Sequence, residues 1–142
     1  MQPYNHKIIE PKWRERWAAD RLYETPDAVS GKANYYLLTE FSYPSGTLHV
    51  GHWYAFAGPD ILARKKRMEG YNVLYPVGFD ALGLPAENAA IKRGLDPRKW
   101  TYENIAHMRE QLASMGASFD WSREVVTYDP EYYRWTQWIF LK

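Results

Sequence analysis

A chain of 142 residues has the size of one domain and can bury a hydrophobic core. Apolar residues make up 46% of it and the formal net charge is +1, so it lacks the strongly basic surface of a dedicated nucleic-acid-binding protein. Cysteine is absent, which excludes a disulfide framework and a cysteine zinc site. The first residues lack the apolar core of a signal peptide, and we expect a cytoplasmic location.

The first predicted element is a helix over about residues 6–23, because apolar side chains recur at helical spacing. Three of them share one face: Ile9, Trp13 and Trp17. Pro11 is expected in the first turn, where its missing N–H costs nothing. The following stretch is rich in Pro, Asp, Ser and Gly, which is typical of a loop. Residues 1–33 are therefore predicted to form an amino-terminal helix and linker.

Two short apolar runs bounded by turn signals are predicted to be buried strands, NYYLLTE at 34–40 and YNVLYPV at 71–77. Between them a helix is predicted from about His49 to Glu69, with Gly70 in the position of a left-handed cap. A strand, a helix and a second strand with this spacing indicate a parallel βαβ unit. The fold class expected is therefore α/β.

Further elements are predicted after the second strand. Helices are expected over 86–92 and 97–115, and three residues mark the apolar face of the longer one: Ile105, Met108 and Leu112. The stretch GASFDWSRE is expected to be irregular and EVVTY to be a short strand. A last helix opens at Pro130 and is strongly apolar, with Trp135, Trp138, Ile139 and Phe140.

The motif with the clearest chemistry is FSYPSGTLHVGH, residues 41–52. His49 and His52 are expected in the first turn of the crossover helix, where residues three apart share a face. A helix start offers free N–H groups and the positive end of the dipole, which favour an anion. Gly51 leaves space for a flat ring against the backbone, and Gly46 permits close approach or an unusual dihedral. The motif therefore favours a polyphosphate and a purine, with the imidazoles donating to phosphate oxygens.

Two further interpretations of the histidines are open. A metal pair is less favoured, because zinc-binding histidines on a helix usually lie four apart and have a third ligand. A structural role, in which one histidine caps the helix and the other packs, suits an isolated H-x-G-H motif equally well.

Three stretches together resemble a known family. PSGTLHVGH, at 44–52, resembles the His-containing signature of the class I aminoacyl-tRNA synthetases. YNVLYPVGFDALGLPAENAAIKRG, at 71–94, is similar to the bacterial leucine-specific branch of that family, and so is the stretch from 117 to 142. The resemblance covers Tyr4 to Lys142. It implies a Rossmann-like nucleotide-binding fold, of which 34–142 would be the first half, ending before the editing insertion.

The resemblance also implies a reaction and its substrates. Leucine would attack the α-phosphate of ATP to give leucyl-adenylate and pyrophosphate, and the acyl group would then pass to the terminal ribose of tRNA(Leu). Mg²⁺ is expected with the ATP, and no protein-bound metal site is expected in this segment.

Site roles follow from the same resemblance. The histidines would contact the phosphates and ribose of ATP, and Gly51 would leave room for the adenine. The ATP-binding set implied is Pro44, Gly46, His49, Gly51 and His52. Two aromatic residues, Phe41 and Tyr43, would line the pocket for the leucine side chain. Asp80 would hold the α-ammonium group, although without the resemblance it is an ordinary turn aspartate.

Part of the family's machinery lies outside these residues, since its Lys-Met-Ser-Lys-Ser loop is not among them. The chain is therefore expected to be the amino-terminal piece of a longer enzyme, to need the remainder of its own chain and to be inactive alone in tRNA charging.

Three different functions compete with this interpretation. The first is that of an isoleucine- or valine-specific synthetase, against which the stretch FDALGLPAENAA argues. The second is that of a non-catalytic nucleotide-binding module, which the short length of the chain favours. The third is that of a small nucleotidyltransferase, which explains His49 and His52 but not the rest of the sequence.

Overall fold

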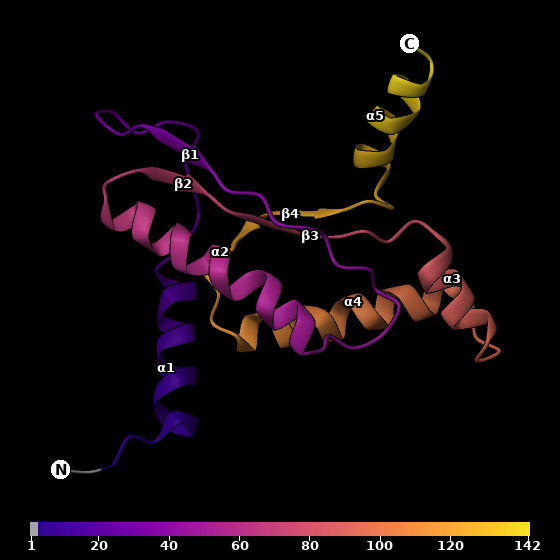
Figure 1. Ribbon diagram of the computed structural model, residues 1–142, viewed down its shortest axis with the longest axis horizontal. Helices are drawn as coiled ribbons and strands as arrows, with labels where there is room; N and C mark the ends of the chain where they lie inside the picture. Colours follow the sequence, from indigo (N-terminus) through magenta and orange to yellow (C-terminus); the bar gives the residue numbers. More distant parts are fainter. Residues whose placement is uncertain (1–2) are drawn as a thin grey trace.

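The computed structural model describes residues 3–142, and Figure 1 shows the arrangement of its helices and strands. The helices are α1 (His6–Ala19), α2 (Val50–Met68), α3 (Leu84–Ile91), α4 (Pro97–Ser114) and α5 (Pro130–Phe140). The strands are β1 (Asn34–Tyr36), β2 (Asn72–Leu74), β3 (Pro76–Phe79) and β4 (Asp120–Val126). The α/β class predicted from the sequence is confirmed.

The predicted βαβ unit is present, since β1 pairs in parallel with β2 and α2 connects them. The single strand predicted over 71–77 is instead two strands that belong to different pairs. The chain changes partner at Tyr75, whose carbonyl accepts the N–H of Asp120 over 2.8 Å. Hydropathy alone does not reveal such a change, because the residues on both sides of it are apolar.

A second parallel pair, β3 with β4, was not predicted. β4 begins at Asp120, within the stretch expected to be irregular. The sequence did not predict this start because the first half of the strand is polar and shows no apolar alternation. Asp120 is fully buried, and its carboxylate accepts the N–H groups of Thr25 and Ser122 over 2.8 and 3.1 Å. These hydrogen bonds satisfy a polar group that would otherwise be costly to bury.

The observed helices match the predicted ones well for α2 and α4 and less well for α1. α2 begins and ends within one residue of its predicted limits, and the predicted apolar face of α4 is buried. The prediction for α1 is wrong in two respects. The helix ends at Ala19 rather than 23, and Pro11 lies in its second turn, where a prolyl nitrogen removes a backbone hydrogen bond.

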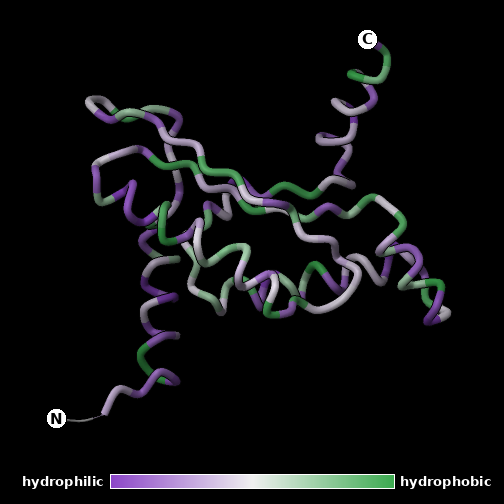
Figure 2. Tube along the Cα trace, viewed as in Figure 1, coloured by the Kyte–Doolittle hydropathy of each residue, from purple (hydrophilic) through white to green (hydrophobic). Residues whose placement is uncertain are grey.

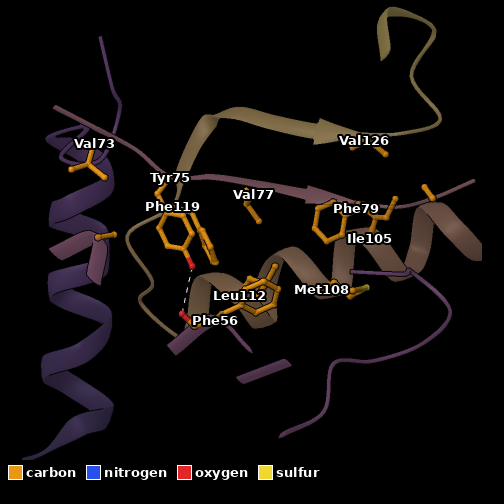
Figure 3. Packing of buried hydrophobic residues seen from close by; sticks show 12 residues of the cluster. Phe56, Val73, Tyr75, Val77, Phe79, Ile105, Met108, Leu112, Phe119 and Val126 are labelled. Carbon is orange, nitrogen blue, oxygen red and sulfur yellow. Dashed lines mark hydrogen bonds between the residues drawn. The ribbon is translucent and has the colours of Figure 1, made fainter. Parts of the chain in front are cut away.

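The core lies between the strands and the two long helices. Figure 3 shows alternate residues of one strand run facing α2 and α4: Tyr75, Val77 and Phe79. They pack against Phe56, Ile105, Met108, Leu112 and Phe119. Burying a side chain of this size contributes about 1.5–3 kcal/mol. The hydroxyl of Tyr75 donates to the carbonyl of Phe56 over 3.5 Å, and burial raises the pKa of Tyr75 to about 12, so this tyrosine stays protonated.

The side of the strands away from α2 and α4 is more open. The prediction that residues 34–40 are buried is wrong, since Tyr36 and Leu38 are 60% and 56% exposed. Exposed and half-buried residues alternate over 34–40, because one face of this segment packs against the core through Tyr35 and Leu37 while nothing within residues 3–142 buries the other face. α5 extends away on this side (Figure 1), and none of its residues is buried.

Hydrophobic residues follow the central strands, whereas α1 is mostly hydrophilic (Figure 2). None of the helices in residues 3–142 combines the length and the apolar composition that a membrane span requires.

Candidate active site

The two histidines of the motif cap α2. His49 is the N-cap residue, and its Nδ1 accepts the N–H of Gly51 over 3.1 Å. In return, the backbone N–H of His49 donates to Nδ1 of His52 over 3.2 Å. Two amide groups that a helix start leaves unpaired are thus satisfied by two imidazoles, in the manner of a capping box. Both histidines therefore have a capping role.

This arrangement determines where the imidazole protons lie. A neutral imidazole that accepts a hydrogen bond at Nδ1 carries its proton on Nε2. Both rings, whose centroids are 4.1 Å apart, therefore offer an Nε2–H donor. Partial burial and the neighbouring His49 lower the pKa of His52, and Glu40 acts in the opposite direction. The neutral form of His52 is favoured, and the two Nε2–H groups can each donate a hydrogen bond to an anion without disturbing the cap.

The two glycines of the motif differ. A Cβ on Gly51 would lie 2.9 Å from both Nδ1 and Cε1 of His49, so the ring that requires this glycine in the structure is the imidazole of His49. Gly46 has no positive φ, so an unusual dihedral is not the reason for this glycine, and the space around it is open. Pro44 is fully buried and its carbonyl accepts the amide of Asn104 over 3.2 Å, which attaches the loop to α4.

The three residues proposed for amino-acid binding line one cavity of about 850 Å³. They are Phe41, Tyr43 and Asp80. The other lining residues come from the loop after β1, the loop after β3, and the β4–α5 region: Glu40, Leu82, Thr127, Tyr132, Tyr133, Thr136 and Gln137. The cavity thus combines apolar and aromatic walls with a few polar groups, as small-molecule sites usually do.

A glycine in β3 makes room for one wall of this cavity. A Cβ on Gly78 would lie 2.7 Å from Cδ1 of Phe41 and 2.8 Å from the carbonyl oxygen of Val125. The Phe41 ring therefore rests directly against the backbone of β3. Any larger residue at position 78 would press on both this ring and the backbone of β4.

Asp80 directly follows β3. Its N–H donates to the carbonyl of Ser42 over 3.0 Å, and one carboxylate oxygen, Oδ1, accepts the hydroxyl of Thr127 over 3.2 Å. Within residues 3–142 this carboxylate forms no ion pair. It is therefore available to a cationic group of a ligand.

The structure does not bring the histidines and Asp80 into one cavity. His49 and His52 line a separate surface hollow of about 350 Å³, which Gln111 and Met115 of the α4 region also border. The side chain of Gln111 accepts the N–H of Leu48 over 3.0 Å and so supports the loop before the motif. Among residues 3–142 there is no group of three or more His, Cys, Asp or Glu that could hold a metal ion.

Sequence reasoning missed Thr127, Gln111 and the α5 residues of the cavity. Thr127 lies in a weakly patterned stretch, and Gln111 is a polar position of an amphipathic helix. Only the strand pairing and the packing of α4 bring them to the site. No spacing in the sequence signals these roles.

Comparisons with known proteins agree with the geometry. The family model for tRNA synthetases class I (I, L, M and V) matches residues 12–142. The leucine–tRNA ligase of Herpetosiphon aurantiacus is 59% identical over 140 residues, and that of Rubrobacter xylanophilus is 60% identical over 139 residues. Each alignment covers 98% of this chain and 17% of the relative.

Two solved structures of aminoacyl-tRNA synthetases are similar to the chain, one more closely than the other. The Agrobacterium radiobacter K84 agnB2 LeuRS, in a ternary complex with tRNA and LeuAMS, superposes with a TM-score of 0.92 at 37% identity, over 98% of this chain and 18% of that one. The Mycobacterium tuberculosis methionyl-tRNA synthetase, in complex with methionyl-adenylate, superposes with a TM-score of 0.65 at 31% identity, over 70% of this chain and 19% of that one. The chain thus spans about one sixth of the length of the leucine–tRNA ligases that it matches.

Proposed function

The chain belongs to the class I tRNA synthetases for isoleucine, leucine, methionine and valine, and we propose that the protein containing it is a leucine–tRNA ligase. It would activate leucine with ATP and transfer it to tRNA(Leu), in the cytoplasm. The observation that carries the proposal is the cavity that gathers Phe41, Tyr43 and Asp80 from separate segments. The 59–60% identity to two leucine–tRNA ligases supports the choice of leucine.

Leucine is proposed to bind through two kinds of contact, a charged one to its ammonium group and an apolar one to its side chain. The carboxylate of Asp80, which forms no ion pair within residues 3–142, would accept hydrogen bonds from the α-ammonium group. Phe41 and Tyr43 would enclose the side chain. Because the Phe41 ring lies against Gly78, this wall is held rigidly by the strand beneath it.

ATP binding is proposed at the start of α2. The two imidazoles would donate their Nε2–H groups to phosphate and ribose oxygens, at the positive end of the helix dipole. Gly51 would hold the His49 imidazole against the helix start, beside the space proposed for the adenine, and Pro44 and Gly46 would shape the loop. Mg²⁺ would accompany the ATP. Because the leucine carboxylate is itself the nucleophile, the protein's contribution is to position the reactants and to neutralise charge that develops on the phosphate.

The remainder of the protein is proposed to complete the site. Residues 34–142 would form the first half of a Rossmann-like catalytic domain, preceded by the helix and linker of 1–33. The histidine hollow and the proposed leucine cavity have different lining residues in this chain, and the remainder of the protein would join them into one site. We expect residues 1–142 alone to give no tRNA charging.

Amino-acid-dependent pyrophosphate exchange by the full gene product tests the proposal. Leucine should support exchange, whereas isoleucine, valine and methionine at the same concentration should support far less. Exchange that favours isoleucine or valine would show another member of the family. No exchange with any amino acid, under conditions where ATP binds, would favour a non-catalytic nucleotide-binding module.

A further inference from the structure

Thr127 is a buried residue just beyond the end of β4 whose side chain is shared by three partners. It is 8% exposed and lines the proposed leucine cavity. Its Oγ1 accepts the N–H of Ala81 over 2.7 Å and that of Leu82 over 3.2 Å. The same oxygen lies 3.2 Å from Oδ1 of Asp80.

These contacts leave the hydroxyl one orientation. A threonine hydroxyl has one proton and two acceptor lone pairs. The two backbone N–H groups occupy both lone pairs. The proton is therefore directed to Oδ1 of Asp80, the acceptor within reach.

The hydrogen bond between Thr127 and Asp80 joins the ends of two paired strands. Asp80 follows β3 and Thr127 follows β4, and these strands pair in parallel with Phe79 opposite Val126. The backbone N–H of Thr127 also donates to the carbonyl of Phe79 over 3.1 Å. The strand pairing therefore fixes the distance between the hydroxyl and the carboxylate. A change in this distance would require the hydrogen bonds between β3 and β4 to break.

We infer that Thr127 is a positioning residue for Asp80, which orients the carboxylate so that Oδ2 points to the α-ammonium group of the amino-acid substrate. The inference rests on the proposed function. Thr127 also holds the loop at Ala81 and Leu82, so its test must separate the orientation of the carboxylate from the shape of the loop. A hydrogen bond to a charged group corresponds to roughly a tenfold to hundredfold effect on binding.

The experiment compares Thr127→Val with Thr127→Ser in the full gene product. Valine keeps the shape and removes the hydroxyl, whereas serine keeps all three hydrogen bonds. Thr127→Val should raise the leucine KM in pyrophosphate exchange roughly tenfold or more, with the ATP KM nearly unchanged. Thr127→Ser should restore most of the leucine affinity. Thr101→Val, at a threonine of α4 that is 7% exposed, controls for the cost of changing a buried threonine.

Two further measurements separate the carboxylate from the loop. 4-Methylpentanoate, which is leucine without its amino group, should inhibit the wild type and Thr127→Val equally. In an Asp80→Ala background, the Thr127→Val change should have little additional effect on the leucine KM. Thr127 acts on the loop, and the inference is overturned, if Thr127→Val weakens the binding of 4-methylpentanoate as much as that of leucine. The same conclusion follows if Thr127→Val still raises the leucine KM in the Asp80→Ala background.

Failure of the inference and failure of the proposed function give different results. If Asp80→Ala leaves the leucine KM unchanged, the proposed amino-acid site is wrong, and the inference falls with it. If Asp80→Ala raises the leucine KM and Thr127→Val does not, the site stands and only the positioning role is overturned. A melting temperature for each folded variant, close to that of Thr101→Val, shows that the comparison concerns binding rather than unfolding.

Discussion

The two candidate regions of this molecule are built in opposite ways. The histidine cap at α2 is made by residues 49–52, and its hydrogen bonds span at most three positions along the chain. The proposed leucine cavity draws on segments near 40, 80 and 127–137, and its polar contact joins residues 47 positions apart. A local motif of the first kind forms wherever its helix forms. A site of the second kind exists only after the strands have paired.

Both regions also contain a glycine that receives a ring. Gly51 accommodates the imidazole of His49, two positions away, whereas Gly78 accommodates the ring of Phe41 from a distant segment of the chain. The same device therefore serves a local cap in one region and a long-range wall in the other. Substitutions can show whether each region has the separate role that its construction indicates.

The largest expected effect is that of Asp80→Ala on the cavity. Removing one partner of a desolvated charged pair should weaken leucine binding by roughly 2–5 kcal/mol. The leucine KM in pyrophosphate exchange should rise far more than the ATP KM. Glu40→Ala removes a carboxylate from the same cavity and is the matched control, for which we expect a small change. Equal effects of Asp80→Ala on both substrates would instead mean that Asp80 maintains the loop.

His49→Ala should give the next largest effect. It should slow pyrophosphate exchange and leave leucine binding nearly unchanged. Loss of a donor aimed at developing charge typically slows a reaction about 10²-fold. Loss of the cap should also cost about 1 kcal/mol of stability. Asp96→Ala is the control, because Asp96 caps α4 by accepting the N–H of Lys99 over 2.9 Å. Similar melting temperatures with a slow exchange rate only in His49→Ala would support the phosphate role, and unchanged exchange would restrict His49 to capping.

Gly78→Ala should have a smaller effect, in the cavity alone. The new Cβ would press on both Phe41 and the Val125 carbonyl, and overpacking of this kind typically costs about 1–3 kcal/mol. We expect a lower melting temperature together with a higher leucine KM. Gly58→Ala, at a glycine of α2 with no atom within 4 Å of the new Cβ, should not lower the melting temperature. A Gly78→Ala protein with wild-type leucine KM would show that Phe41 does not form the pocket wall.

The smallest expected effect is a pH dependence that arises at the histidine cap. The pKa of folded His52 is lowered from its ordinary value of 6.5, so the unfolded chain binds more protons as the pH falls through this range. The stability contributed by the cap is therefore complete above about pH 6.5 and is lost progressively below it. His52→Gln provides the control, because glutamine can accept the same N–H but does not titrate. The melting temperature of the wild type should fall more between about pH 7.5 and 5.5 than that of His52→Gln, and identical pH profiles would contradict the assignment.

Much of the local structure was predictable. The limits of α2, the apolar face of α4 and the parallel connection of β1 to β2 follow from periodicity and turn signals. The importance of His49 and His52 was also visible, because a helix start between two strands is a recognisable place for an anion. Their reciprocal bonding was only half anticipated, since the capping interpretation assigned the cap to one histidine.

Other features depended on partners that the sequence does not specify. The break at Tyr75 and the early start of β4 depend on which strand lies beside which, and the exposure of Tyr36 depends on which face of β1 is covered. Thr127 has the same character, because its hydroxyl acquires a role only where β4 lies against β3.

The sequence by itself determined the limits of α2, the apolar face of α4, the first βαβ unit and half of the histidine cap, because these arise from contacts within a few residues and from the burial of apolar faces. The tertiary structure alone decided the strand order, the cavity around Asp80 and the orientation of its carboxylate. The physical reason is that a hydrogen bond between residues 80 and 127 requires both strands to be in register first. Register is a property of the packed sheet and its pairing, and periodicity within a single strand does not encode it.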